Sequence, residues 1–305
     1  MAPVEQFRHG AHHGRKRPEG AGEDRGSEDG ATGTVPSSGL DPLLYPWDPP
    51  DNSGVLDGDA FLLLDQIADL AEALTDAGAA PLQARSPVVS VGANSSPDVL
   101  RRKFAGYHRP VSQVLPMMRG QLHNVGIGHS AHVSRAGYIA AAPYLQPGEC
   151  TTVWVSWLDD LQLLALDETE PNYRRVRLEG TACPLVLDNP VVLDNGGRPE
   201  AFSLYASRWG VLADADGCPL PLMDQPALFG RLASAGAGLD AVGAGGAGTR
   251  RDGMPSVFAG PPEAVAANLA DPVIQERAKG WFALAGLAAQ LHFDQGAAGA
   301  GVLSL

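Results

Sequence analysis

Residues 87–104 read Pro-Val-Val-Ser-Val-Gly-Ala-Asn-Ser-Ser-Pro-Asp-Val-Leu-Arg-Arg-Lys-Phe. The apolar beginning, from Pro87 to Val91, predicts a short buried strand, which the glycine and polar residues at 92–95 break. Ser96 stands where a helix cap is expected and a proline and an aspartate follow it, so we expect a short helix reaching about Phe104. The segment predicts a strand, a tight turn and a helix in succession.

The turn in this segment is a candidate binding site. A glycine turn followed by a helix start leaves several backbone N–H groups unpaired and directed into one small volume. Such donors can receive a carboxylate or a developing oxyanion. The alternative is an ordinary tight turn, capped by Ser96 and without a ligand.

A second candidate site is the acidic sequence Leu166-Asp-Glu-Thr-Glu170. It closes a helix that we expect over Asp159 to Glu168, and it precedes Pro-Asn-Tyr-Arg-Arg-Val at 171–176. Carboxylates at a helix C-terminus disfavour one another and the helix dipole, which raises the pKa of any that is buried. A glutamate in that state can move a proton near neutral pH. The alternative is a solvated acidic helix end.

Taken together, the two candidate sites resemble the γ-glutamylcyclotransferase-like family. The family's early strand ends in a Tyr-Gly-Ser-Asn loop, which Val91-Gly92-Ala93-Asn94 matches in part. Its Leu-Asp-x-x-Glu segment, followed by Tyr-x-Arg, is similar to the residues from Leu166 to Glu170 and to Tyr173-Arg-Arg. The resemblance covers residues 88–213, roughly 40% of the chain.

The resemblance implies an α+β fold, a small mixed β-barrel with flanking helices, to which helical segments are added at both ends. It implies a cofactor-independent cyclotransferase that releases 5-oxoproline from a γ-glutamyl amide or peptide. Glu170 would be the general acid/base. Substrate binding would fall to the 91–94 loop and Tyr173, that is, to Val91, Gly92, Ala93, Asn94 and Tyr173.

Three positions depart from the family pattern, because Val91 replaces its Tyr, Ala93 its Ser, and Pro171 a frequent Gly. Two side-chain hydroxyls are thereby missing from the loop. One alternative is therefore a non-catalytic relative that binds a small metabolite. Another is an amide hydrolase or an accessory module of amide metabolism. The leaving amine and the pathway stay open.

The family-like core is expected over 87–222, with strands at 133–142, 151–157, 173–179 and 201–207. Before the core we expect a disordered tail over 1–39 and a helical extension over 40–86, whose main helix runs from Asp57 to Ala77. After it, residues 223–305 predict a helical extension. Its helices are expected at 224–233, 261–270 and 272–291, and a flexible glycine-rich loop at 235–248.

Composition restricts the partners. The 305 residues include 22 Lys and Arg against 35 Asp and Glu, a net charge of -13. This charge repels phosphate backbones and anionic lipid, so we expect neither nucleic acid nor a membrane as a partner. Three scattered cysteines argue against a disulfide framework. The N-terminus has no apolar stretch of signal-peptide type, so we expect a cytoplasmic protein. The oligomeric state stays open.

Two further patterns are expected to have no function. Residues 243–248 fit G-x-G-x-x-G, but the sequence after them cannot open the helix that a dinucleotide site requires, so we expect a mobile linker. His123, His129 and His132 are close in sequence, but no carboxylate completes a ligand set. We expect surface or turn histidines and no metal.

Overall fold

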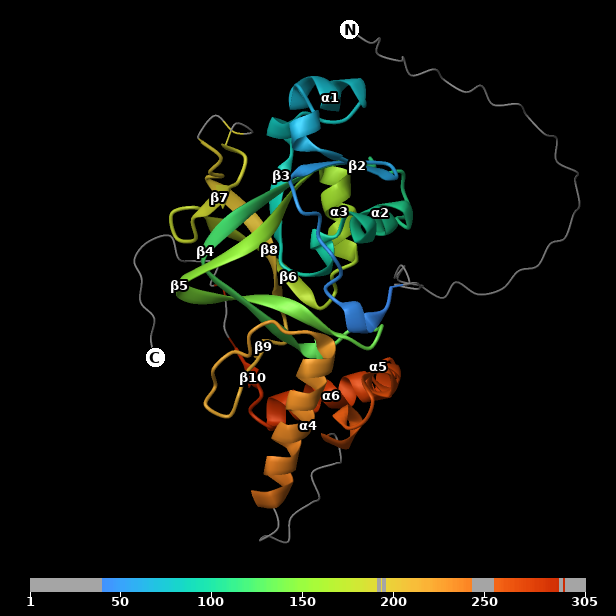
Figure 1. The fold of residues 1–305 in the computed structure, drawn as a ribbon, viewed down its shortest axis with the longest axis vertical. Coiled ribbons are helices and arrows are strands. Elements are labelled where there is room, and N and C mark those ends of the chain that lie inside the picture. Colours follow the sequence, from blue (N-terminus) through green and yellow to red (C-terminus); the bar gives the residue numbers. More distant parts are fainter. Residues whose placement is uncertain (1–39, 191–192, 194–195, 243–254, 291–292, 294–305) are drawn as a thin grey trace, which may run out of the picture. The chain divides into compact units, whose positions relative to one another are not determined.

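Two twenty-residue strands, β4 (Val114–Val133) and β5 (Ile139–Leu158), pair antiparallel along most of their length and organise the fold (Figure 1). A register shift lies beside Asn124, whose φ of 63° is one that asparagine tolerates better than most residues. The structure is a computed structural model that describes residues 40–190, 193, 196–242, 255–290 and 293. The predicted disordered tail lies outside these residues.

One mixed sheet contains all the described strands, which pair with β4 or β5 directly or through one or two intervening strands. Its main path runs β10-β9-β4-β5-β3-β8-β6, in which β3 lies antiparallel to β5 and parallel to β8. The strands on this path besides β4 and β5 are β3 (Ser86–Ser90), β6 (Tyr173–Glu179), β8 (Ala201–Ser207), β9 (Val211–Leu212) and β10 (Ala288–Ala289). Outside the path, β1 (Gly54–Asp57) and β7 (Leu185–Leu187) pair with β4, and β2 (Ala60–Leu63) pairs with β1.

The expected β-barrel is wrong. The path has two ends, β10 and β6, and no ladder among the described residues joins them. A barrel requires its first and last strands to pair. Here β4 instead uses its length to pair with β1, β5, β7 and β9 at different positions, so the sheet branches and stays open.

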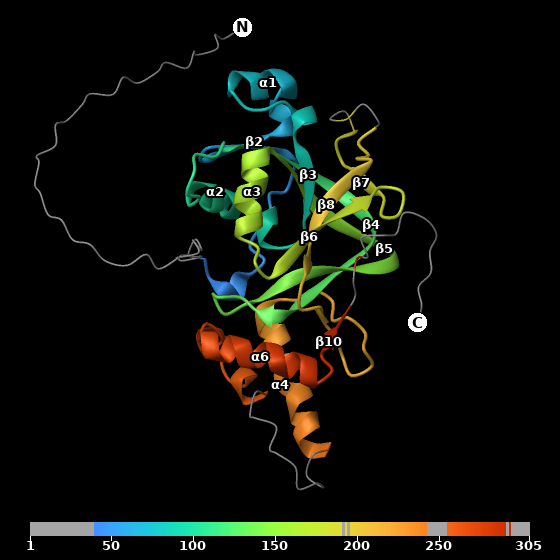
Figure 2. The same ribbon diagram turned by 180° about the vertical axis from the view of Figure 1, so that it is seen from behind.

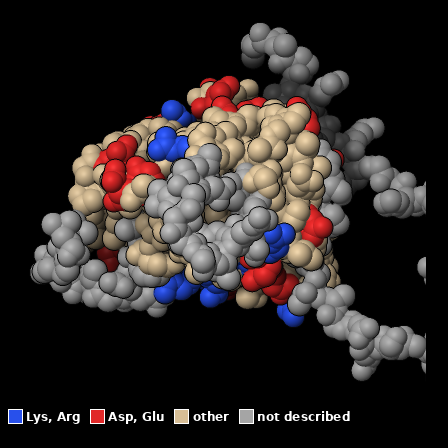
Figure 3. All heavy atoms as spheres, turned by 90° about the horizontal axis from the view of Figure 1, so that it is seen from below, with Lys and Arg blue, Asp and Glu red and all other residues tan. Residues whose placement is uncertain are grey.

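The helices gather at two places (Figures 1 and 2). α2 (Pro97–Ala105) and α3 (Asp160–Glu168) lie side by side against the upper part of the sheet, and the short α1 (Leu70–Asp76) lies above them. α4 (Gln225–Val242), α5 (Pro262–Leu269) and α6 (Pro272–Leu284) gather at the opposite end. Among the described residues, no helix combines the length and the apolar composition needed to cross a bilayer. At the α4–α6 end, acidic and basic side chains lie in separate small groups (Figure 3).

Strand β3 is buried on both faces, which explains its uninterrupted apolar sequence. Consecutive strand residues point to opposite faces. Val88 packs with Leu100 and Phe104 of α2, whereas Val89 packs with Val155 and the strand residues beyond it. A third cluster joins the sheet to α4–α6 through Leu212, Leu228, Phe229, Phe258, Leu269 and Phe282.

The local predictions around the sheet are largely confirmed. The strands expected at 87–91, 173–179 and 201–207 form, and residues 151–157 lie within β5. The helices expected at 96–104, 159–168 and 261–270 form within one residue at each end. All three have a proline or an aspartate at their beginning.

The helix expected from Asp57 to Ala77 is wrong over most of its length. Residues 54–63 form the hairpin β1–β2, whose turn contains Gly58 at a φ of 57°. Leu56 is fully buried because β1 pairs with β4, so tertiary pairing overrides the helical spacing of the apolar residues. Within this span a 3-10 turn at Leu64–Gln66 and α1 are helical, and Asp69 caps α1 by accepting hydrogen bonds from two backbone N–H groups.

Three other boundaries differ from expectation. The strand expected over 133–142 is interrupted by a turn at Ser134–Tyr138 that contains Gly137 at a φ of 85°. Helix α4 continues to Val242, so residues 235–242 of the expected loop are helical, and 243–248 lie outside the described residues. Helix α6 ends at Leu284, because Gly286 adopts a φ of 69°.

A buried arginine joins the upper helices to the sheet. The guanidinium of Arg85, 6% exposed, donates to the carbonyls of Val114 and Trp157 at 3.3 and 3.1 Å. It also donates to Gln162 Oε1 at 3.0 Å, and that oxygen accepts from the Asp159 backbone N–H at the start of α3. One side chain thus ties β4, β5 and α3 together. Burial lowers the pKa of Arg85 from its usual value, an effect that the charge of Asp159 opposes.

Arg85→Met should lower the free energy of unfolding by about 3 kcal/mol, because buried acceptors lose a charged donor. Denaturant unfolding measures the change. The matched control is Arg119→Met, which breaks a half-exposed ion pair with Asp188 and should cost about 1 kcal/mol or less. Equal losses of unfolding free energy for the two variants would contradict the role of Arg85 in joining β4, β5 and α3.

Candidate functional site

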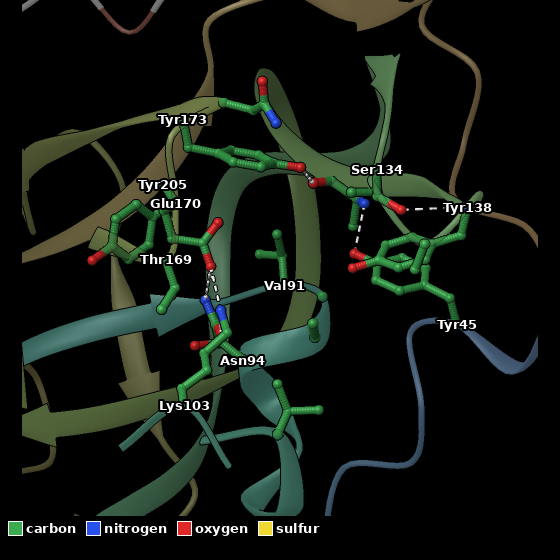
Figure 4. Close-up of a pocket in the computed structure, with 18 of the residues that line it drawn as sticks. Tyr45, Val91, Asn94, Lys103, Ser134, Tyr138, Thr169, Glu170, Tyr173 and Tyr205 are labelled. Atoms are coloured by element: carbon green, nitrogen blue, oxygen red, sulfur yellow. Dashed lines mark hydrogen bonds and ion pairs between the residues drawn. The ribbon is translucent and has the colours of Figure 1, made fainter. Parts of the chain in front are cut away.

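A cavity of about 210 Å³ opens between the 91–94 loop, helix α2, the turn before β5 and the residues that follow α3 (Figure 4). It is lined by side chains from five segments of the chain. The polar and aromatic lining residues are Tyr45, Trp47, Ser90, Asn94, Arg102, Lys103, His132, Ser134, Arg135, Tyr138, Thr169, Glu170, Asn172, Tyr173 and Tyr205. All six candidate site residues from the sequence line this cavity.

Glu170 forms a closed polar triangle with two residues of the strand–turn–helix segment. Its Oε1 atom accepts from Asn94 Nδ2 at 2.9 Å and from Lys103 Nζ at 2.7 Å. Lys103 Nζ also donates to Asn94 Oδ1 at 2.8 Å. Both donors bind the same oxygen, and no described residue donates to Oε2. One carboxylate oxygen is therefore fixed while the other is left to the cavity.

Lys103 is a site residue that sequence reasoning missed. Its side chain is 16% exposed and that of Glu170 13%, so the ion pair is largely desolvated. Lys103 lies in the last turn of α2, and its side chain points to Asn94 and Glu170 (Figure 4). The sequence feature that could have identified Lys103 is the basic last turn of the helix directly after the candidate loop.

The three carboxylates near the end of α3 do not crowd one another, contrary to expectation. Asp167 pairs with Arg175 at 2.9 Å and accepts from the Tyr205 hydroxyl at 2.7 Å. Glu168 points to Tyr107 on the outside, at 3.1 Å. Glu170 alone faces the cavity. Each carboxylate has its own partner because successive residues at the end of a helix point in different directions.

Four tyrosines surround the carboxylate of Glu170: Tyr45, Tyr138, Tyr173 and Tyr205. Burial is the main cause that raises the pKa of each, and the negative charge of Glu170 adds to it in all four. The pKa of Tyr138 rises to about 12. The cavity is therefore lined by neutral hydroxyl groups around one carboxylate.

The 91–94 loop is a closed turn in which backbone groups bond one another, rather than an open set of N–H groups for an anion. Ala93–Ser95 form a single 3-10 turn, η4, in which Ser95 N–H donates to the Gly92 carbonyl. Ser96 occupies the expected helix cap position, although its side chain makes no capping hydrogen bond; Ser95 Oγ donates to Gly92 O at 2.7 Å. A Cβ at Gly92 would collide with the hydroxyl of Tyr45. Only glycine allows that close approach.

Tyr173 is held by a buried polar network behind the cavity. Its hydroxyl donates to the Ala141 carbonyl at 2.9 Å, and its ring meets the ring of His132 edge to face. His132 Nδ1 lies 2.5 Å from Ser130 Oγ, which lies 2.6 Å from Ser207 Oγ. Ser130 is fully buried, so this serine and histidine pair positions Tyr173 rather than presenting a nucleophile.

Two of the three histidines of β4 are buried. His129 is fully buried and His132 is 2% exposed, which corrects the expected surface or turn positions for these two. His129 Nε2 accepts from the Met223 backbone N–H, whereas His123 lies near Cys150 on exposed strand positions. No group of three metal-ligating side chains is found in the described part of the chain.

Comparisons with protein-family models and with curated proteins find no significant match to this chain. The resemblance to the γ-glutamylcyclotransferase-like family therefore depends on the motifs and on how the chain arranges them in space.

The buried histidines make stability depend on pH. Burial lowers the pKa of His129 to about 4 and of His132 to about 3, and the charge of Lys279 adds to the second shift. Unfolded histidine has a pKa near 6.5. Below that pH the unfolded chain binds protons that the folded chain does not, so stability falls as the pH drops from about 6.5 to about 3.

Each histidine should contribute a slope of at most about 1.4 kcal/mol per pH unit. Denaturant unfolding between pH 5 and 6.5 isolates this slope, because carboxylates titrate mainly at lower pH. The double variant His129→Gln, His132→Asn keeps polar atoms at the bonded positions and should flatten the slope. An unchanged slope would show that other groups cause it.

Proposed function

We propose that this protein is a cofactor-independent cyclotransferase of the γ-glutamylcyclotransferase-like type, which releases 5-oxoproline from a γ-glutamyl amide or peptide. Residues 87–222 would be a relative of that fold in which the sheet stays open. The observation that carries the proposal is the contact of Glu170 with Asn94, 76 residues earlier, at the wall of one cavity. Two motifs chosen independently in the sequence lie within hydrogen-bond distance.

In the proposed reaction Glu170 accepts a proton from the substrate α-amine as that nitrogen attacks the γ-carbonyl carbon. A carbon–nitrogen bond forms and closes the five-membered ring. The bond to the departing amine then breaks, and Glu170 returns the proton to the departing nitrogen. Lys103 and Asn94 hold Oε1, so Oε2 is the atom that would exchange the proton. Holding amine and carbonyl together supplies much of the acceleration.

The charge of the cavity suits an anionic substrate. Its lining includes three basic residues, Arg102, Lys103 and Arg135, and one acidic residue, Glu170. This excess of positive charge stands out in a chain with a net charge of -13. A γ-glutamyl group carries an α-carboxylate, which basic side chains and hydroxyl donors bind. Tyr45 and Tyr138 also line the cavity with hydroxyls that Val91 and Ala93 lack, whereas Tyr173 and Tyr205 donate theirs to Ala141 and Asp167.

The second candidate is a non-catalytic binding protein for a small carboxylate or amide metabolite. One observation favours it, namely the ion pair between Lys103 and Glu170 at 2.7 Å. A carboxylate engaged with an ammonium and an amide has less freedom to reach a substrate proton. In this reading the cavity binds its ligand and Glu170 is only part of the wall.

The test is the formation of 5-oxoproline from a panel of γ-glutamyl dipeptides, γ-glutamylamines and glutathione, measured by mass spectrometry. Glu170→Gln should lower the rate by about 100-fold or more, because it removes the proton acceptor and keeps the shape. The matched control is Glu168→Gln, two residues away and bonded on the outside, which should leave the rate unchanged.

Equal loss in both variants would show that the helix end, not the carboxylate of Glu170, matters. Ligand binding without any product would favour the binding protein. A free acid in place of 5-oxoproline would favour an amide hydrolase.

A further inference from the structure

We propose that Tyr45, from the segment that precedes the family-like core, donates a hydrogen bond from its hydroxyl group to an oxygen atom of the substrate. This inference rests on the proposed γ-glutamyl substrate and adds a binding residue to that site. The family resemblance begins only at residue 88, so it assigns no role to this tyrosine.

The ring of Tyr45 is fixed on several sides. Tyr45 follows the 3-10 turn η1 (Pro42–Leu44) and is 4% exposed. It stacks on Tyr138 at 4.3 Å between ring centroids and meets Trp47 edge to face at 5.2 Å. Trp47 Nε1 in turn donates to the Asp41 carbonyl at 3.0 Å. The aromatic cluster directs the Tyr45 hydroxyl into the cavity opposite Glu170 (Figure 4).

Ala141 of β5 bonds two tyrosine hydroxyls, one as a donor and the other as an acceptor. The Ala141 N–H donates to the Tyr45 oxygen at 2.7 Å, and the Ala141 carbonyl accepts from Tyr173 at 2.9 Å. Tyr173 has thus committed its proton and offers lone pairs. Tyr45 has committed a lone pair and keeps its proton, for which no acceptor is found among the described residues. The cavity therefore offers one acceptor and one donor at fixed positions.

The 91–94 loop acts on the same oxygen. The hydroxyl lies against Gly92 where a Cβ would collide, and the Ala93 N–H also faces it. A backbone donor that the sequence assigned to the substrate is thus directed at Tyr45. The Ala141 N–H that donates to this oxygen polarises the O–H bond of Tyr45 and strengthens it as a donor. The 91–94 loop would thus contribute to substrate binding indirectly, by acting on the hydroxyl of Tyr45.

The Tyr45 hydroxyl stays protonated near neutral pH. Burial, the neighbouring Tyr138 and the charge of Glu170 all raise the pKa of Tyr45, and the two N–H groups only partly oppose them. A neutral donor suits a carboxylate or a developing oxyanion, since it stabilises negative charge without neutralising Glu170. Residues 41–47 would restore to the loop a hydroxyl that Val91 and Ala93 do not provide.

The first test is binding of γ-glutamylglycine, measured by calorimetry in the Glu170→Gln protein to prevent turnover. Adding Tyr45→Phe should weaken binding about 10-fold or more, because it removes one hydrogen bond to a charged or polar oxygen. The control Tyr107→Phe removes a hydroxyl that bonds Glu168 outside the cavity and should not change affinity. Formation of 5-oxoproline is measured in parallel in proteins that retain Glu170.

These outcomes separate the two proposals. Equal affinity with and without Tyr45→Phe overturns the inference, whatever the turnover. Weaker binding without any 5-oxoproline overturns the proposed activity and supports Tyr45 as a binding residue. Absence of both binding and turnover in the folded protein overturns both.

A second measurement does not depend on how well Tyr45→Phe folds. With 3-fluorotyrosine placed at position 45, the fluorine resonance should shift when γ-glutamylglycine is added, and the same label at 107 should not respond. A resonance at 45 that stays unchanged at saturating ligand overturns the inference.

Discussion

The pairing of β4 with β5 is the constraint on which the rest of the structure depends. Every other strand of the sheet pairs with one of these two directly or through one or two intervening strands. Their common length lets one end pack against α4–α6 while the other supports α2 and α3 (Figure 2). The turn between them, at 134–138, and the first residues of β5 form one wall of the cavity. A shift in this register would move Ala141 away from both tyrosines that it orients.

The site is assembled on that frame from segments far apart in sequence. β3 leads from the sheet interior to the 91–94 loop, and α2 then returns Lys103 toward the loop. The end of α3 delivers Glu170 to the same place. The buried Arg85, which ties β4 and β5 to α3, links the stability of the upper helices to the geometry of the site. Rigid elements therefore hold the polar triangle.

The cavity combines a largely desolvated ion pair with neutral hydroxyls. Lys103 and Glu170 neutralise each other, and Arg102 adds a further basic side chain to the lining. Within this setting Tyr45 and Tyr173 differ in what they offer, although both are bound to the backbone of Ala141. The direction of the hydrogen bond with Ala141, rather than the residue type, decides whether each tyrosine hydroxyl can act as a donor or as an acceptor.

The sequence by itself determined the elements whose signals are local: the strand, turn and helix of 87–104, the helix that ends at Glu168, and the strands at 173–179 and 201–207. It also placed Glu170 and Asn94 among the site residues. Tertiary structure alone decided that residues 54–63 are strands, because β4 supplies their partner, and that the sheet stays open. It also brought Lys103 and Tyr45 to the cavity. The contact of Lys103 with Glu170 spans 67 positions and that of Tyr45 with Ala141 spans 96, so only the folded chain brings these pairs together.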